Sequence, residues 1–132
     1  MRLRTGGMGK VNFAVSKAGS VKAGVVPGDG GPTNKTRIVC AEEGIPTNTL
    51  FAGILELPPG VHGAVHNHHM EEVYYILSGS GWVECEGERK EIAQGDTVWL
   101  SPDVKHRAMN RSSSEPLKLL YVCGVNYDSL KT

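Results

Sequence analysis

Short apolar runs separated by glycine and proline constrain this chain more than any other feature. The sequence holds 17 glycines and seven prolines spread along its length, and the runs between them are rich in β-branched and aromatic residues. No run keeps a sustained apolar stripe at helical spacing. Turn-forming residues recur about every 8–12 residues, which is typical of a β-sandwich or a β-barrel. We therefore predict an all-β fold.

The predicted strands are short and follow one another closely. They are Thr36–Cys40, Thr49–Leu57, His66–His68, Glu72–Leu77, Gly81–Glu86, Thr97–Leu100, His106–Asn110 and Leu117–Val122. Gly24–Lys35 is rich in glycine and proline and is predicted to be a loop. Val11–Ser20 fits either an isolated strand or one helical turn, and both readings stay open.

Both faces of the predicted strand Glu72–Leu77 are largely apolar. Residues two apart in a strand share a face, so Glu72, Tyr74 and Ile76 lie on one side and the residues between them on the other. We expect one side to face a barrel interior. The other side is expected to face a second sheet or a partner subunit.

The length of 132 residues suits one domain. We expect residues 1–35 to form an arm and a loop, and residues 36–125 to form the barrel. The 14 basic and 14 acidic side chains cancel, so no surplus charge points to nucleic acid or to an anionic membrane. No apolar run reaches the length of a membrane span.

Cysteine usage and the first residues both indicate the cytoplasm. Cys40, Cys85 and Cys123 are far apart and odd in number, which predicts free thiols in a reducing compartment. Met1–Gly7 carries two arginines, but no apolar run of a secretory signal follows them.

A group of histidines carries the clearest chemistry. His66 and His68 are two residues apart, so an extended chain directs both imidazoles to one face, and Glu72 lies four residues beyond. His106 begins another predicted strand. Three imidazoles and one carboxylate suit Mn, Fe, Co, Ni, Cu or Zn rather than Ca or Mg. The alternative is a set of surface histidines that binds metal adventitiously.

The spacing around these histidines resembles that of the cupin family. The first cupin motif has its positions filled by Gly60, His66, His68, Glu72 and Gly79. The second motif has its positions filled by Gly95, Asp96, His106 and Asn110. Pro102 stands one place later than the family pattern, and Asp103 replaces the usual turn glycine. Aspartate tolerates the left-handed conformation better than most residues, so we expect the turn to be kept.

This resemblance implies a single cupin barrel, a double-stranded β-helix of the jelly-roll type. It implies one divalent transition metal, with ligands at His66, His68, Glu72 and His106. It also implies that Gly60, Gly79 and Gly95 are turn residues and that Asn110 has a structural role. His69 has the opposite strand parity from His68 and is expected to point away from the metal.

The implied metal site favours a small anionic or chelating ligand. A divalent ion with three neutral imidazoles and one carboxylate keeps a formal charge of about +1. The site suits isomerisation or elimination on a sugar, a keto or hydroxy acid or a diketone, or dioxygenation with Fe or Cu. The alternative is a binding or sensing protein without turnover. The family resemblance covers both.

Residues beyond the ligand set have less specific signals. Tyr74 is the first catalytic candidate, ahead of Glu84 and Tyr121, with a core aromatic as the alternative. His62 follows a Pro-Pro-Gly turn and is a candidate substrate contact. Arg37, Lys105 and Arg107 are candidates to hold a substrate carboxylate, with surface roles expected for each of them. The carboxylates of residues 84–91 are expected to form a solvated hairpin face.

We also predict a homodimer. About 60 residues precede the first motif, which is more than a minimal barrel needs, and exposed apolar strands are commonly covered by a partner. The resemblance implies that N-terminal strands pack on the neighbouring subunit.

Overall fold

The computed structural model describes residues 13–40, 44–45, 47 and 49–124. Its strands are β1 (Gly24–Asp29), β2 (Pro32–Val39), β3 (Leu50–Leu57), β4 (His62–Gly63), β5 (Glu71–Ser78), β6 (Ser80–Cys85), β7 (Glu88–Ala93), β8 (Thr97–Leu100), β9 (His106–Asn110) and β10 (Leu117–Gly124). Within the described ranges no helix has the length and apolar character needed to cross a membrane. The all-β prediction is confirmed.

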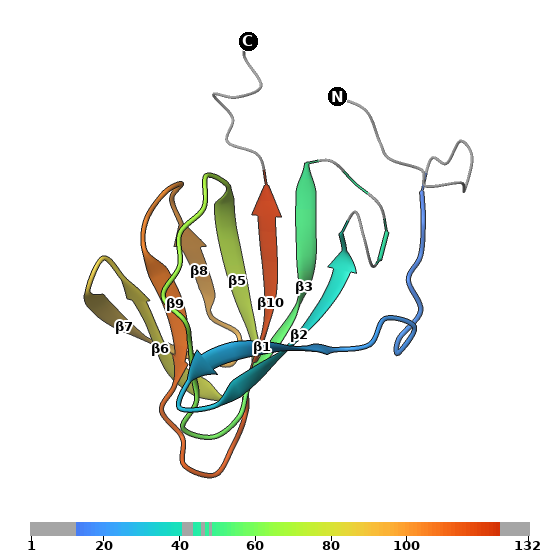
Figure 1. Ribbon diagram of the computed structural model, residues 1–132. Coiled ribbons are helices and arrows are strands. Elements are labelled where there is room, and N and C mark those ends of the chain that lie inside the picture. Colours follow the sequence, from blue (N-terminus) through green and yellow to red (C-terminus); the bar gives the residue numbers. More distant parts are fainter. Residues whose placement is uncertain (1–12, 41–43, 46, 48, 125–132) are drawn as a thin grey trace.

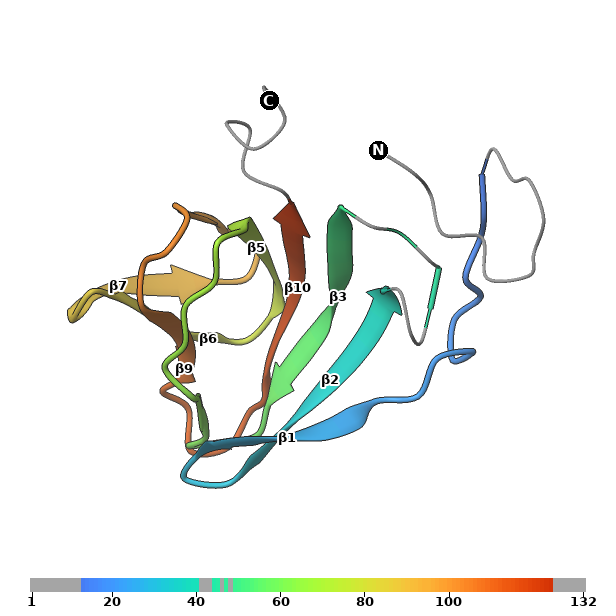
Figure 2. The same ribbon diagram turned by 45° about the horizontal axis from the view of Figure 1, so that its top comes forward.

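All ten strands join in one antiparallel sheet that curls on itself. The strand order is β7-β6-β9-β4-β1-β2-β3-β10-β5-β8. β1 pairs with β2 on one edge and with β4 on the other, so it connects the two halves of the sheet. Figure 1 shows the broad half made of β2, β3, β10 and β5, and Figure 2 shows β6, β7 and β9 facing it across the interior.

Alternation along β5 and β10 builds the core. Glu72, Tyr74 and Ile76 of β5 are buried, so one side of this strand faces the barrel interior as predicted, whereas Tyr75 and Leu77 on the other side are exposed in the single chain. The buried residues of β10 are Leu117, Leu119, Tyr121 and Cys123. The pairing of the two strands places Cys123 opposite Glu72 and Tyr121 opposite Tyr74. The interior therefore changes from hydrocarbon at one end to polar groups at the other.

Two turns show why the motif residues are needed. Asp103 adopts φ 67°, the left-handed conformation expected for an aspartate in place of the turn glycine. Gly79, between β5 and β6, has φ 86°, and a Cβ there would lie 2.4 Å from the carbonyl oxygen of Pro116. Any larger residue at position 79 would have to displace backbone.

The prediction of a loop over Gly24–Lys35 is wrong. The segment contains β1 and begins β2, which form a hairpin through Gly30 and Gly31. Pro27 pairs with Pro32 at the end of the hairpin register, where the missing N–H groups break no inner rung of the ladder. The boundary expected between residues 35 and 36 falls inside β2.

The prediction of a strand over His66–His68 is also wrong. Only a single bridge forms there, in which the backbones of His66 and His106 exchange hydrogen bonds of 3.1 and 2.8 Å. Within the segment left open at Val11–Ser20, residues 13–20 contain a turn closed by Ser20 N–H on the Lys17 carbonyl, and the rest lies outside the described residues. The strand β4 has no counterpart in the sequence prediction, and β7 is predicted only as part of the exposed hairpin over residues 84–91, which β6 and β7 form.

Candidate metal centre

Four side chains from three parts of the chain converge inside one end of the barrel. One potential ligand atom from each of His66, His68, Glu72 and His106 lies within 4.8 Å of all the others. His66 and His68 come from the connection between β4 and β5, and Glu72 and His106 come from β5 and β9. Glu72 and His106 are 5% and 1% exposed, whereas His66 is exposed. The cluster therefore runs from the core to the cavity opening.

The backbone orients all three imidazoles in the same way. The Nδ1 atoms of His66, His68 and His106 lie 2.9, 2.8 and 2.9 Å from the carbonyl oxygens of Ala64, Met70 and Val104. A carbonyl can only accept, so each Nδ1 carries a proton, and in the neutral imidazole each Nε2 keeps its lone pair. A hydrogen bond at the distal ring nitrogen is how metal-ligating histidines are commonly fixed.

Glu72 connects two of these imidazoles. Its Oε1 lies 3.2 Å from His68 Nε2 and 2.9 Å from His106 Nε2. Ligand atoms about 2.1 Å from a metal and at right angles to one another are separated by about 3.0 Å. The observed spacings therefore fit the donor atoms around a transition metal. The second carboxylate oxygen, Oε2, accepts a hydrogen bond from the Cys123 thiol at 3.0 Å.

The charge states of the cluster depend on these contacts. Burial by itself raises the pKa of Glu72, but the hydrogen bonds from His106 and Cys123 outweigh it and lower the pKa. Burial opposes protonation of His106, but its hydrogen bond to Glu72 prevails and raises the pKa. Burial lowers the pKa of His66, which favours the neutral, ligating form.

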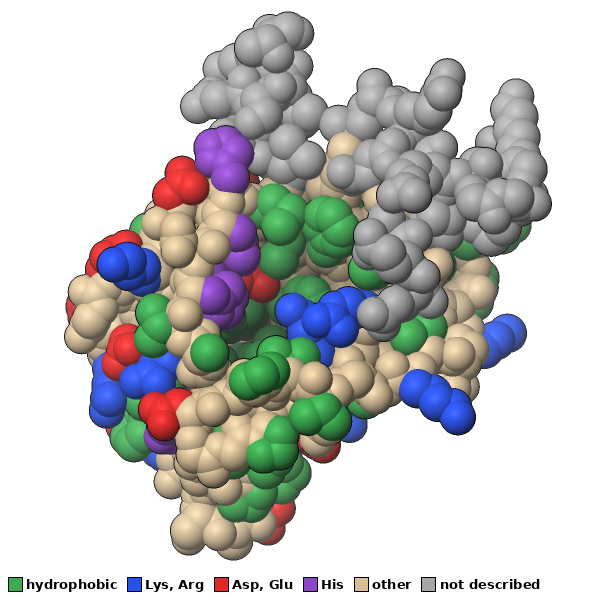
Figure 3. Space-filling view, in the orientation of Figure 1, with side chains coloured by type: hydrophobic (Ala, Val, Ile, Leu, Met, Phe, Trp, Pro, Cys, Tyr) green, Lys and Arg blue, Asp and Glu red, His purple; other side chains and the backbone are tan. Residues whose placement is uncertain are grey.

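Three members of the cluster, His66, His68 and Glu72, form one wall of a cavity of about 400 Å³. Its described lining residues are Lys35, Arg37, Val39, Cys40, Phe51, His66, His68, Met70, Glu72, Tyr121 and Cys123. Figure 3 shows histidine side chains on one side of this hollow and Lys and Arg side chains on the other, with apolar groups between them. A ligand in the cavity would lie between the cluster and two cations.

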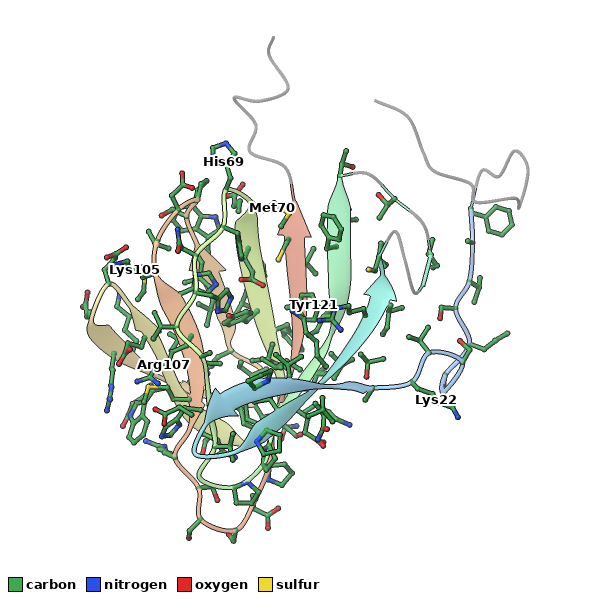
Figure 4. All side chains as sticks on the ribbon, in the orientation of Figure 1. Lys22, His69, Met70, Lys105, Arg107 and Tyr121 are labelled. Atoms are coloured by element: carbon green, nitrogen blue, oxygen red, sulfur yellow. The ribbon has the colours of Figure 1, made fainter. Side chains whose placement is uncertain are left out.

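Tyr121 of β10 also lines this cavity, on the strand beside the one that carries Glu72. It projects from β10 toward β2 (Figure 4), and the ammonium of Lys35 lies 4.8 Å from its ring centroid. Gly53 is its neighbour on β3, and a Cβ at that position would lie 2.6 Å from the Tyr121 hydroxyl. Burial raises the pKa of Tyr121 to about 12, so the phenol keeps its proton at neutral pH.

Tyr74, the first catalytic candidate from the sequence, lies in the core. It is 2% exposed, and its ring centroid is 6.4 Å from that of His106. It lines a second, smaller cavity of about 210 Å³, to which Lys35 and His66 also contribute. Burial raises the pKa of Tyr74 well above its usual value. Its catalytic role stays a prediction.

The two remaining histidines lie outside the cluster. His69 is at the exposed tip before β5 (Figure 4), where its Nδ1 lies 3.3 Å from Asp103 Oδ2, so it points away as predicted. His62 pairs with Met109 across β4 and β9, and it lines neither of the two cavities beside the cluster. Its role as a substrate contact stays a prediction.

The three charged residues that were expected on the surface have different surroundings. Lys105 is exposed, as expected. Arg107 is 14% exposed in its side chain and bridges Glu84 and Asp29 at 3.0 and 3.1 Å, so it ties β9 to β6 and β1. The surface role expected for Arg37 is wrong, because this side chain lines the larger cavity. The misreading of Gly24–Lys35 as a loop hid the alternation that places Lys35 and Arg37 on one face.

Cys123 is the contact to the cluster that the sequence did not reveal. Burial and the hydrogen bond to Glu72 raise the pKa of its thiol, and Lys35 opposes this rise. The three cysteines are free thiols, as predicted. No local spacing links Cys123 to Glu72, since they lie 51 residues apart and meet only through the register of β5 and β10.

Comparisons with known proteins agree with this architecture. A stretch of 63 residues is 38% identical to the (R)-mandelonitrile lyase of Granulicella tundricola and covers 46% of this chain and 48% of that protein. A stretch of 67 residues is 34% identical to an oxalate-binding protein of Thermotoga maritima, covering 50% and 54%. The chain thus spans about half the length of these relatives.

Solved structures share the fold. The crystal structure of a predicted oxalate decarboxylase from Thermotoga maritima superposes with a TM-score of 0.73 at 21% identity, over 86% of this chain and 100% of that one. A polyketide cyclase from Streptomyces resistomycificus superposes with a TM-score of 0.71 at 19% identity, over 86% and 80%. The family model of the cupin domain matches residues 53–123, which contain the four clustered side chains, and the chain therefore belongs to the cupin family.

Proposed function

We propose that His66, His68, Glu72 and His106 bind one divalent transition metal, and that the protein is a metal-dependent enzyme for a small oxygenated metabolite. The observation that carries the proposal is the set of three Nδ1 hydrogen bonds, which leave three Nε2 lone pairs and one carboxylate oxygen directed at a common point. The donor set of three imidazoles and one carboxylate suits Mn, Fe, Co, Ni, Cu or Zn.

Such a metal would polarise a ligand oxygen and acidify the neighbouring C–H, or, if it is Fe or Cu, support reaction with dioxygen. The protein side chains would bind and orient the ligand. Lys35 and Arg37 supply positive charge opposite the cluster, and Tyr121 offers a protonated hydroxyl. The favoured ligand is a sugar, a keto or hydroxy acid or a diketone that presents adjacent oxygens.

Metal binding is tested by elemental analysis of untagged protein purified without added metal or chelator. We expect about one equivalent of a transition metal per chain, lost in His66→Ala and in a His66→Ala/His106→Ala double variant. His66 is exposed, so the single variant should fold. His69→Ala is the matched control, because His69 lies outside the cluster. A folded parent chain that neither contains nor takes up metal would refute the proposal.

Two of the relatives with named activities are enzymes, which supports a catalytic role. A lyase and a dioxygenase, the latter 31% identical over 71 residues, both match this chain over part of its length. The retained metal directs the assay: Fe or Cu toward oxygen consumption, and Mn, Co, Ni or Zn toward isomerase and lyase reactions. Turnover that is lost in His66→Ala and kept in His69→Ala is the expected result.

A binding protein without turnover is the second candidate. Among the described cavity residues, every imidazole and carboxylate belongs to the cluster, so none of these is left to act as a general base when the cluster binds a metal. An oxalate-binding protein is also among the relatives. Saturable binding of oxalate to the metal-loaded protein, with no product detectable by NMR for any candidate substrate, would favour this role.

The assembly and the compartment form a second part of the proposal. We infer a homodimer, because Tyr75, Leu77 and Trp99 expose 43%, 36% and 60% of their surfaces on the outer face of β5 and β8. Sheets commonly bury such a face against another sheet. Three free thiols suit the reducing cytoplasm.

A further inference from the structure

A lysine on the cavity wall is the feature that the metal cluster leaves unexplained. Lys35 lies on the inner face of β2 and lines both the larger and the smaller cavity. Its ammonium contacts the face of the Tyr121 ring, 4.8 Å from the centroid. The ion pairs formed between described residues do not include Lys35. Lys35 is half-buried on the cavity wall, where a charge-assisted hydrogen bond to an anion in the cavity would stabilise its ammonium.

The charges around the cavity do not balance. A divalent metal, three neutral imidazoles and the Glu72 carboxylate leave about one positive charge. Lys35 adds a second positive charge on the opposite wall, beside that of Arg37. Glu72 is the single carboxylate among the described residues that line the cavity. A cavity with two positive centres attracts a ligand with two negative groups more strongly than a ligand with one.

We propose that Lys35 binds a carboxylate at one end of the ligand while the metal binds oxygens at the other end. The ligand is then a small dicarboxylic acid of the 2-oxo or 2-hydroxy class. This inference rests on the proposed metal function. A cavity of about 400 Å³ has room for several carbon atoms between the two ends. An acid with only the chelating end would leave the ammonium without an anionic partner.

The competing role for Lys35 is structural. In that role its methylene stem would cover apolar surface, and its charge would be held by the ring of Tyr121. A structural lysine affects folding without distinguishing between ligands. The two roles therefore differ in ligand selectivity.

The test compares two acids that differ only in the distal carboxylate. Protein loaded with Mn²⁺ is titrated calorimetrically with 2-oxoglutarate and with 2-oxopentanoate, using the parent chain, Lys35→Met and Lys118→Met. Methionine keeps the length and the apolar stem while removing the charge. Lys118 is exposed on β10 and serves as the matched control. Metal content is measured on every sample.

We expect the parent chain and Lys118→Met to bind 2-oxoglutarate about 10- to 100-fold more tightly than 2-oxopentanoate, the range for one charged hydrogen bond. Lys35→Met should lose this preference, with its metal content and its affinity for 2-oxopentanoate unchanged. A preference that persists in Lys35→Met, equal affinities in the parent chain, or binding of neither acid at millimolar concentration would overturn the assignment while leaving the metal site intact. A parent chain that takes up no metal would overturn both.

Discussion

Cys123 and Glu72 face each other across β10 and β5, and the Cys123 thiol donates a hydrogen bond to Glu72 Oε2 over 3.0 Å. The other carboxylate oxygen, Oε1, contacts His68 and His106. The thiol therefore occupies Oε2 with a hydrogen bond and leaves Oε1 directed toward the histidines. In the proposed metal site, Glu72 would therefore bind through a single oxygen.

Removal of this thiol should weaken metal binding. We expect Cys123→Ala to lower the affinity for Mn²⁺ or Zn²⁺ by about tenfold, because loss of a hydrogen bond to a ligand commonly costs 10- to 100-fold. Cys123→Ser keeps a donor and should retain most of the affinity. Cys85→Ala, which changes a cysteine outside the cavity lining, is the control. Competition with a chromophoric chelator measures each affinity. Equal affinities for Cys123→Ala and the parent chain would contradict this positioning role.

The stability of the metal-free protein should depend on pH through His106. Burial opposes its protonation, but Glu72 raises its pKa above 6.5, so protonated His106 stabilises the fold. This contribution is complete below the unfolded pKa of about 6.5 and is lost as the pH rises through the folded value. In EDTA, the free energy of unfolding in urea should therefore fall on the alkaline side of about pH 6.5.

The acid side is governed by Glu72. The hydrogen bonds from His106 and Cys123 lower its pKa against the opposing effect of burial, so its contribution is present above the unfolded pKa and is lost as the pH falls through the folded value. Metal binding should reverse the alkaline trend, since the metal requires neutral His106 and competes with the proton. His106→Gln should flatten the alkaline limb. An unchanged limb in this variant would contradict the assignment to His106.

Local spacing decided how much of this protein the sequence could predict. The cluster was identifiable because His66, His68 and Glu72 lie close together in the chain, and the matching motif adds His106. The places of Lys35 and Cys123 beside the cluster were not identifiable from the sequence, because they depend on which strands pair and in which register. The glycines and prolines of Gly24–Lys35 resemble a loop, although they form the hairpin that carries Lys35 into the cavity.

Asn110, the structural position implied by the second motif, connects three parts of the chain. Its Nδ2 donates to the carbonyl oxygens of Leu57, Pro58 and Glu115, and its Oδ1 accepts from Ser112 N–H. The side chain is 1% exposed. We expect Asn110→Ala to lower the free energy of unfolding by about 2–4 kcal/mol, because buried carbonyls lose their donor.

Two other variants separate the donor from the shape of this side chain. Asn110→Asp keeps the shape but removes the donors, and it should be at least as unstable as Asn110→Ala. Ser113→Ala, in the same exposed connection, should unfold like the parent chain. Urea denaturation followed by tryptophan fluorescence measures all of them. A loss below about 1 kcal/mol for Asn110→Ala would show that the connection does not depend on this amide.

The outer face of β5 and β8 should control the oligomeric state. Tyr75 and Leu77 are exposed there, and Trp99 of β8 pairs across the strands with Val73. Across the other edge of β5, Tyr75 is adjacent to Leu120 of β10. The apolar surface is thus continuous over three strands, and its burial between two copies would remove it from water.

Light scattering at micromolar concentration should give twice the 14.2 kDa of one chain. Tyr75→Glu and Leu77→Glu should each shift the mass toward a monomer, because a buried carboxylate without a partner opposes association by several kcal/mol. Both residues are exposed in a single chain, so the variants should keep their fold and their metal content. Ser113→Glu adds the same charge away from this face and should leave the dimer intact. A parent chain that is monomeric at these concentrations, or a Tyr75→Glu variant that remains dimeric, would show that this face is not the subunit interface.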